Sequence, residues 1–188
     1  MRAFVAIDIP SNIRERIRDL IGALKPLDPN IRWARPEGVH ITLKFLGEVP
    51  LPKVEQVSSA LSNVKLPASF RVGIEGCGYF PNERSPRVAW LGIEAGMELS
   101  ELAKEVETAL EPLGFAPEQR AFSPHLTLGR LREPGKIRAV QEALREREPL
   151  SFGSFEVAEF YLYESKLSPN GSIYSKVAHF EISANRNS

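Results

Sequence analysis

Residues 40–43 read His-Ile-Thr-Leu, and residues 125–128 read His-Leu-Thr-Leu, so one tetrapeptide pattern occurs in each half of the chain. In a strand, alternate side chains point to opposite faces of the sheet. The two aliphatic residues of each copy therefore share one face, and the histidine and the threonine share the other. A chain of 188 residues with only three histidines is thus expected to build two half-buried strands, each presenting an imidazole beside a hydroxyl group.

Strand and helix patterns mix along the rest of the sequence. Runs of β-branched and aromatic residues predict strands, and apolar residues three and four positions apart predict helices. The first helix is expected to have Ser11 as its N-cap and to end before Pro26. The predicted strands cover residues 2–9, 31–34, 39–46, 69–79, 87–94, 125–131, 152–164 and 173–182. The apolar stripe of the first predicted helix runs from Ile13 to Leu24, and the other predicted helices cover residues 52–64, 98–113 and 136–147.

This order of elements favours an α+β fold with antiparallel or mixed sheets, because hairpin-like neighbours occur in place of a strict strand–helix alternation. No linker or low-complexity segment divides the chain, so residues 1–188 are expected to form one domain. Each half carries two helices, several strands and one His-x-Thr strand. We therefore expect a bilobal molecule with two pseudo-symmetric lobes, one from each half, with helices on the outside and a central cleft.

Composition argues against several classes of protein. The formal net charge is zero, so we do not expect the protein to bind duplex nucleic acid through many phosphate contacts. A local site for one phosphate is compatible with this charge. Cys77 is the only cysteine, which rules out an intramolecular disulfide or a Cys-based zinc site and suits a reducing cytoplasm. No signal peptide and no run of 18 apolar residues is present, so we expect a soluble, cytoplasmic protein without a membrane partner.

Two imidazoles that face each other suit acid–base work on a phosphodiester. An imidazole titrates near neutrality, so one ring can accept a proton while the other donates one. Displacement at phosphorus requires this pair, a base for the entering oxygen and an acid for the leaving oxygen. Thr42 and Thr127 lie on the same faces as His40 and His125, and their hydroxyl groups can hydrogen bond to the non-bridging phosphate oxygens. This chemistry needs neither a metal nor a cofactor.

Other interpretations of the histidines are less favoured by the sequence. The histidine and threonine of a single His-x-Thr strand are more often a half-buried polar pair than catalytic residues. Two copies with aliphatic residues at the same positions favour a catalytic role instead. A zinc site is disfavoured because His40, His125 and His179 have no recognisable ligand spacing. We expect His179 to be either a surface histidine or one whose hydrogen bonds are satisfied within the protein. The chain has no G-x-S-x-G elbow of a serine hydrolase and no glycine-rich loop that opens a helix.

With HITL at 40–43 and HLTL at 125–128, the chain resembles the two-histidine phosphoesterase superfamily. Within it, the chain is similar to the bacterial and archaeal RNA 2′,3′-cyclic phosphodiesterases, historically called 2′–5′ RNA ligases. The resemblance covers nearly the whole sequence. It includes RAFVAIDIP, HITLKFLGEV, GCGYFPNERSPRVAWLGI, FSPHLTLGR and LYESKLSPNGSIYSKVAHFEI.

The resemblance implies a bilobal fold with a central cleft and hydrolysis of a terminal 2′,3′-cyclic phosphate on RNA to a 2′-phosphomonoester. It implies that His40 is the proton donor to the leaving 3′-oxygen and that His125 is the proton acceptor that activates water. Thr42 and Thr127 would hold the phosphate oxygens. Joining of 2′–5′ linkages in vitro is a related expectation, because a ribose hydroxyl then takes the place of water. We expect the protein to act as a monomer on RNA ends or a related cyclic nucleotide.

Four further residues are candidate substrate contacts. Arg130 shares the parity of the buried Leu128, but a bend at Gly129 would redirect it toward a phosphate. Lys44 shares the parity of His40 and Thr42 and is a candidate for attracting the RNA backbone, with a solvated surface lysine as the alternative. Two aromatic positions are candidates for stacking on a base, although core packing is an alternative for each. They are Phe45 and one of the neighbours Tyr79 and Phe80.

Two alternative functions remain open on the sequence. One is a non-catalytic module that binds an RNA end or a nucleotide. The other keeps the catalysis but changes the substrate to a small cyclic phosphate or to 2′–5′ oligoadenylate, because a His-x-Thr motif contacts only the phosphate.

Overall fold

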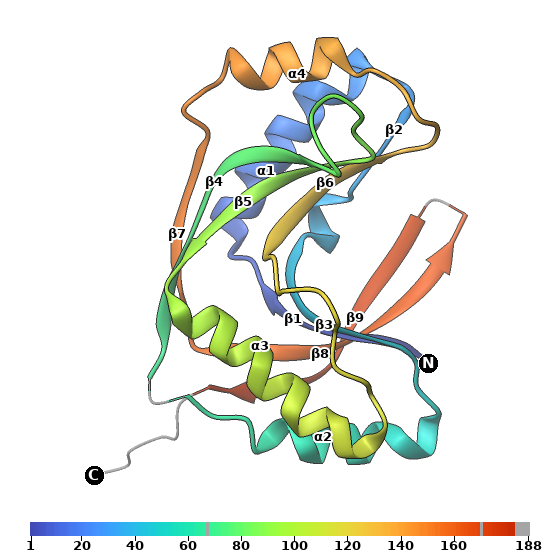
Figure 1. Ribbon diagram of the computed structural model, residues 1–188, viewed down its shortest axis with the longest axis vertical. Coiled ribbons are helices and arrows are strands. Elements are labelled where there is room, and N and C mark those ends of the chain that lie inside the picture. Colours follow the sequence, from blue (N-terminus) through green and yellow to red (C-terminus); the bar gives the residue numbers. More distant parts are fainter. Residues whose placement is uncertain (67, 170, 183–188) are drawn as a thin grey trace.

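The computed structural model describes residues 1–66, 68–169 and 171–182, and it contains two antiparallel sheets (Figure 1). The four-stranded sheet has the order β3-β1-β8-β9, and the five-stranded sheet has the order β2-β6-β5-β4-β7. The first sheet contains β1 (Arg2–Asp8), β3 (His40–Glu48), β8 (Glu159–Ser168) and β9 (Gly171–Glu181). The second contains β2 (Ile31–Trp33), β4 (Phe70–Phe80), β5 (Val88–Ala95), β6 (His125–Leu131) and β7 (Ser151–Val157). The α+β class and the antiparallel pairing are therefore confirmed.

The four predicted helices are confirmed, with ends that differ from the predicted ones by at most three residues. They are α1 (Ser11–Leu24), α2 (Leu51–Ser62), α3 (Met97–Leu110) and α4 (Arg138–Arg145). The prediction that Ser11 caps α1 is wrong, because Ser11 is already helical and Pro10 is the N-cap residue. Proline fits the start of a helix because it has no backbone N–H that would need a partner inside the helix. In the described part of the chain, no helix is both long and apolar enough to cross a bilayer.

The prediction of one lobe from each half of the sequence is wrong, because the two halves are interleaved. The sheet that holds the first motif takes β1 and β3 from the N-terminal half and β8 and β9 from the C-terminal end. The sheet that holds the second motif includes β2 and β4 from the first half. Both sheets therefore depend on residues from both ends of the sequence.

The predicted strand over residues 152–164 is two strands in different sheets. β7 pairs with β4, whereas β8 pairs with β1 and β9, and the change occurs at Ala158. The parity of the buried residues changes at this point, because Val157 and Phe160 are both buried although they lie three positions apart. Pairing partners distant in the sequence, rather than a local turn signal, decide where the chain leaves one sheet for the other.

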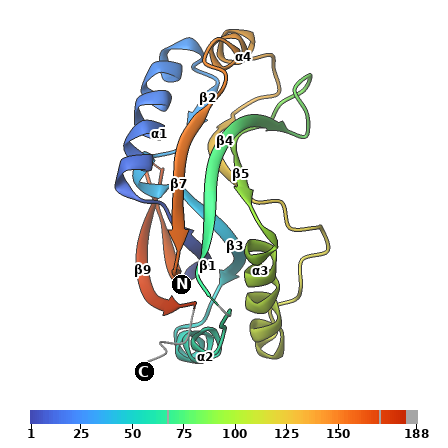
Figure 2. The same cartoon turned by 90° about the vertical axis from the view of Figure 1, so that its left-hand side faces the viewer.

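The helices cover the sheets from outside. α3 lies against β3, α2 lies against β9 and beside α3, and α1 packs on β7 (Figure 2). One large cluster of buried apolar side chains joins both sheets and these helices, and it includes Ile41, Leu43, Leu126 and Leu128. The aliphatic half of each motif is therefore anchored in the shared core.

Candidate active site

Both motif strands place their side chains as the alternation predicts. Ile41 and Leu126, the second residues of the two copies, are fully buried. The histidine and threonine of each copy lie on the opposite face and are only partly buried. We call this opposite face of each sheet the site face. Cα atoms of β3 and β6 come within 8 Å of each other, and the two strands meet in the middle of the molecule (Figure 1).

A β-bulge follows the threonine in each motif. Against β1, Thr42 pairs with Ala6 and Lys44 pairs with Val5, so Leu43 is the extra residue. Against β5, Thr127 pairs with Trp90 and Gly129 pairs with Ala89, so Leu128 is the extra residue of the second copy. A bulge places two residues opposite one and therefore reverses the parity of the strand beyond it. The two motifs share their irregularity as well as their sequence.

The bulge in β3 overturns the prediction for Lys44. Its side chain turns to the core side and is 3% exposed, with Nζ 2.8 Å from the carbonyl oxygen of Ala116 and 3.3 Å from Glu107 Oε1. The ammonium group is thus occupied by α3 and the loop after it, and it cannot attract an RNA backbone at the site face.

The same bulges bring Phe45 and Arg130 to the site face. Phe45 is 64% exposed and its ring lies 6.1 Å from that of Phe4, centroid to centroid. Arg130 is exposed and pairs with Val88, which lies two residues before Trp90 on the same face of β5. These two residues hold equivalent positions in the two motifs, and the redirection of Arg130 beyond Gly129 is the bend that the sequence suggests.

The His125 side chain is held by the backbone just before β6 and by two aromatic rings. Its Nδ1 lies 2.8 Å from the carbonyl oxygen of Ser123, which fixes a tautomer that carries the proton on Nδ1. Nε2 is then the nitrogen that can accept a proton. The Phe80 ring meets the imidazole edge-on with centroids 4.9 Å apart, and the Trp90 ring lies 6.3 Å away. A Cβ on Gly78 would lie 2.3 Å from the Trp90 ring, so this position must be glycine for the indole to pack there.

Phe80, rather than Tyr79, is the aromatic neighbour of the second motif. Tyr79 pairs with the buried Ala89 and packs against the shared core, on the face of β4 that points away from His125. Burial raises the pKa of the Tyr79 hydroxyl. The prediction that Tyr79 stacks on a base is therefore wrong.

His40 lies in a more apolar environment than its counterpart. Its ring stacks on Phe4 with centroids 4.5 Å apart and meets the edge of Tyr174 at 5.2 Å. Burial lowers the pKa of His40 from its ordinary value of 6.5 to about 4, although a hydrogen bond with the backbone of Gly38 and the charge of Asp8 act in the opposite direction. In both motifs, the histidine thus bonds to the backbone two residues before it, at Gly38 and at Ser123.

A charged network surrounds Asp8, which pairs with His40 across β1 and β3. Its carboxylate forms ion pairs with Arg14 and Lys176. Burial alone would raise the pKa of Asp8, but the hydrogen bond from Lys176 and the charge of Arg14 outweigh it and lower the pKa below its usual value. Asp8 therefore remains an anion beside His40 at neutral pH.

Sequence reasoning missed most of the aromatic side chains that surround His40. The missed residues come from distant strands, and only the alternation of tyrosines in residues 159–164 indicated that β8 exposes aromatic rings on one face. They are Phe4, Tyr163 and Tyr174.

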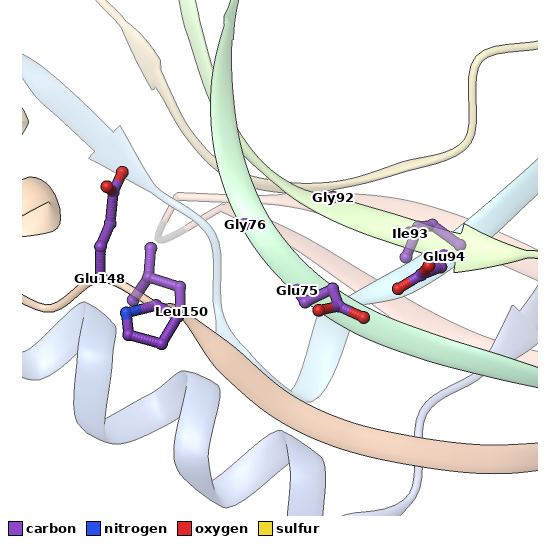
Figure 3. A pocket seen from close by; sticks show the side chains of 8 residues that line it. Glu75, Gly76, Gly92, Ile93, Glu94, Glu148 and Leu150 are labelled. Atoms are coloured by element: carbon purple, nitrogen blue, oxygen red, sulfur yellow. The ribbon is translucent and has the colours of Figure 1, made fainter.

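The described residues offer no donor set for the zinc alternative. Within those ranges, no three His, Cys, Asp or Glu side chains are grouped closely enough to hold a metal ion. His179 is exposed on β9 and pairs with Tyr161. The open pocket in Figure 3 carries three carboxylates, and it contains neither motif histidine. Its acidic residues are Glu75, Glu94 and Glu148.

Comparison with known families gives two matches to one family model. The model is described as LigT-like phosphoesterase, and it matches residues 7–90 and residues 91–174. Each match contains one His-x-Thr motif.

Curated relatives match over nearly the whole length. A protein from Archaeoglobus fulgidus named RNA 2′,3′-cyclic phosphodiesterase is 39% identical over 181 residues, which cover 96% of this chain and 100% of the relative. A protein of the same name from Thermotoga maritima is 35% identical over 178 residues, covering 93% of this chain and 91% of the relative.

Solved structures agree with these matches. The structure of E. coli LigT complexed with 3′-AMP aligns with a TM-score of 0.77 at 30% identity, covering 97% of this chain and 98% of that one. The structure of TT0787 of Thermus thermophilus aligns with a TM-score of 0.78 at 30% identity, covering 98% of this chain and 100% of that one.

Proposed function

Because this chain belongs to the family of LigT-like phosphoesterases, we propose that it hydrolyses the terminal 2′,3′-cyclic phosphate of RNA to a 2′-phosphomonoester. The observation that carries the proposal is the pair of equivalent strands β3 and β6, each with a histidine, a threonine and a bulge at the same positions. Both motifs come from one chain, so the site needs no second copy of the protein. We further expect residues 1–188 to act as one two-lobed unit, a monomer, in the cytoplasm. The two site faces meet across a central cleft that holds the phosphate.

In this reaction, the oxygen of water bonds to phosphorus while the bond from phosphorus to the 3′-oxygen breaks. His125 takes the proton from water through Nε2, because Nδ1 is bonded to Ser123. His40 gives its proton to the leaving 3′-oxygen. Thr42 and Thr127 donate hydrogen bonds to the non-bridging oxygens, where negative charge must be stabilised. With a ribose hydroxyl in place of water, the same displacement joins a 2′–5′ linkage.

His40 can act as an acid only if the substrate raises its pKa. In the free protein the imidazole is neutral at pH 7, because its pKa is about 4. A phosphate anion beside the ring favours the imidazolium form, as the neighbouring Asp8 already does. Binding of the substrate is therefore accompanied by uptake of a proton at His40.

This proton uptake is measurable by NMR. In a titration of isotope-labelled histidine rings, His40 is expected to titrate near pH 4 in the free protein. With a saturating deoxydinucleotide, whose phosphodiester stays singly charged over this range, the midpoint should move upward. A midpoint near 6.5 in the free protein would contradict the packing of His40. Because the unfolded chain binds this proton below about pH 6.5, stability should also fall between about pH 6.5 and pH 4.

The reaction is tested with an oligonucleotide that ends in a 2′,3′-cyclic phosphate, followed by ³¹P NMR in excess EDTA. We expect the cyclic-phosphate signal to be replaced by that of a 2′-phosphomonoester. Binding without turnover would favour the binding-module alternative. Turnover of a small cyclic phosphate or of 2′–5′ oligoadenylate, but not of the oligonucleotide, would favour the second alternative.

Phe45 supplies a stacking platform for the terminal base, because its ring is exposed on the site face next to Phe4. Stacking on an aromatic side chain contributes about 1–3 kcal/mol per base. Phe45→Ala should therefore raise KM for an adenosine 2′,3′-cyclic phosphate end by roughly fivefold to 150-fold with little change in kcat. Leu51→Ala is the matched control, since Leu51 is a similarly exposed apolar residue on α2. An unchanged KM in Phe45→Ala would remove Phe45 from the site.

A further inference from the structure

Two arginines lie directly opposite each other on the five-stranded sheet. In the pairing of β2 with β6, Arg32 is the cross-strand partner of Arg130. Cross-strand partners point to the same face, and like charges in this position repel each other. Neither guanidinium group has an acidic partner in the described part of the chain. Both side chains are exposed, so an anion from solution can reach them.

This arginine pair lies in line with the second motif. Val88, Trp90 and Gly92 alternate on the site face of β5, and they pair with Arg130, Thr127 and His125 in that order. The cross-strand pairs that contain His125, Thr127 and Arg130 therefore lie one after another along one face, and Arg32 lies next to the last of them. Four residues of strand span about 13 Å. Side chains as long as that of arginine can reach back over this distance toward a phosphate one nucleotide away from the reacting one.

The other end of the same face is acidic. Glu94 follows Gly92 on the site face of β5, and Glu75 lies beside it on β4 (Figure 3). The hydrogen bond with Glu94 and the negative charge of Glu94 raise the pKa of Glu75. The two carboxyl groups therefore lie close together. Negative charge at this end repels a polyanion, whereas the arginine end attracts one. The face therefore gives a bound nucleic acid strand a direction.

We infer that Arg32 and Arg130 form a second phosphate subsite, which binds the internucleotide phosphate on the 5′ side of the terminal cyclic nucleotide. This inference rests on the proposed function and adds the substrate class, which is an oligonucleotide end and not a free mononucleotide. A guanidinium pair suits a phosphodiester because each group can donate two parallel hydrogen bonds to its oxygens.

The test uses two dinucleotides that end in the same ribonucleoside 2′,3′-cyclic phosphate. In one the internucleotide link is a charged phosphodiester, and in the other it is an uncharged methylphosphonate. A 2′-deoxynucleoside on the 5′ side prevents cleavage of the link. The wild-type protein should show a kcat/KM about tenfold higher for the charged dinucleotide. Arg32→Gln should reduce this ratio to near one, and Arg32→Lys should restore part of it.

Arg16→Gln is the matched control, because Arg16 is an exposed arginine of α1 and its replacement changes the net charge equally. Its ratio should remain that of the wild type. Arg130→Gln should also lose the ratio, and the double variant should lose no more than either single one, because both arginines bind one phosphate. Melting temperatures exclude misfolding, and Arg32→Gln should not melt earlier than the wild type, since it relieves a repulsion.

The outcomes of this experiment distinguish failure of the phosphate subsite from failure of the proposed function. Equal kcat/KM for the two dinucleotides in the wild-type protein would overturn the subsite and leave the proposed function standing. A preference for the charged dinucleotide that persists in Arg32→Gln and Arg130→Gln would also overturn it. Hydrolysis of neither dinucleotide would refute the proposed function itself.

Discussion

His125→Ala is expected to lower kcat for hydrolysis of a cyclic-phosphate end by about 10²–10⁴-fold, and His40→Ala by a similar factor. Each variant removes one proton transfer and leaves the phosphate contacts of both threonines in place. Because the two transfers belong to one displacement, the double variant should be only slightly slower than the slower single one. Steady-state rates for the three variants, measured in EDTA, check this.

The third histidine of the chain provides the control for these variants. His179 is exposed on β9, and its ring makes no contact with either motif in the described structure. His179→Ala should keep the wild-type kcat. If His179→Ala were as slow as the motif variants, or if both motif variants kept full activity, acid–base catalysis by His40 and His125 would be wrong.

Removal of the threonine hydroxyl groups should have the next largest effect. Thr42→Val and Thr127→Val preserve the shape and the strand preference of the side chain, so that the bulges and the buried leucines are undisturbed. Each loses one hydrogen bond to the phosphate oxygens as charge develops on them, which should lower kcat by about 10²-fold. The loss should appear in kcat and in kcat/KM alike, because the contact is strongest in the transition state.

Thr108→Val is the corresponding control, since Thr108 is the third threonine and is exposed on α3. It should leave both kinetic constants unchanged. A rise in KM without a fall in kcat for Thr42→Val and Thr127→Val would show that the hydroxyl groups only hold the ground-state substrate.

Much of the fold follows from local patterns in the sequence. The predicted bounds of β6 are correct at both ends, because its histidine and its leucines mark the half-buried strand clearly. The helices follow from their apolar stripes, as in α3, where Leu99, Leu102 and Val106 are buried. Interleaving of the halves could not be predicted because it depends on which distant strands pair, and β7 and β8 have no turn residue between them.

The candidate site is predictable up to the threonine of each motif and less so beyond it. Strict alternation places Lys44 beside Thr42, but the bulge at Leu43 turns Lys44 inward and Phe45 outward. Nothing local in the sequence indicates a bulge there. The environment of His40 was also unpredictable, since Phe4 and Tyr174 reach it from opposite ends of the chain.

The most direct test of the account concerns the different roles of the two histidines. In a cyclic phosphate whose 3′-oxygen is replaced by sulfur, the 3′-sulfur leaves phosphorus as a thiolate and needs no proton donor. With this substrate, His40→Ala should approach the wild-type rate in single-turnover experiments, whereas His125→Ala should remain slow because water still needs a base. If His125→Ala were rescued and His40→Ala were not, the roles would be reversed. If sulfur rescued neither variant, acid–base catalysis by these two strands would be contradicted.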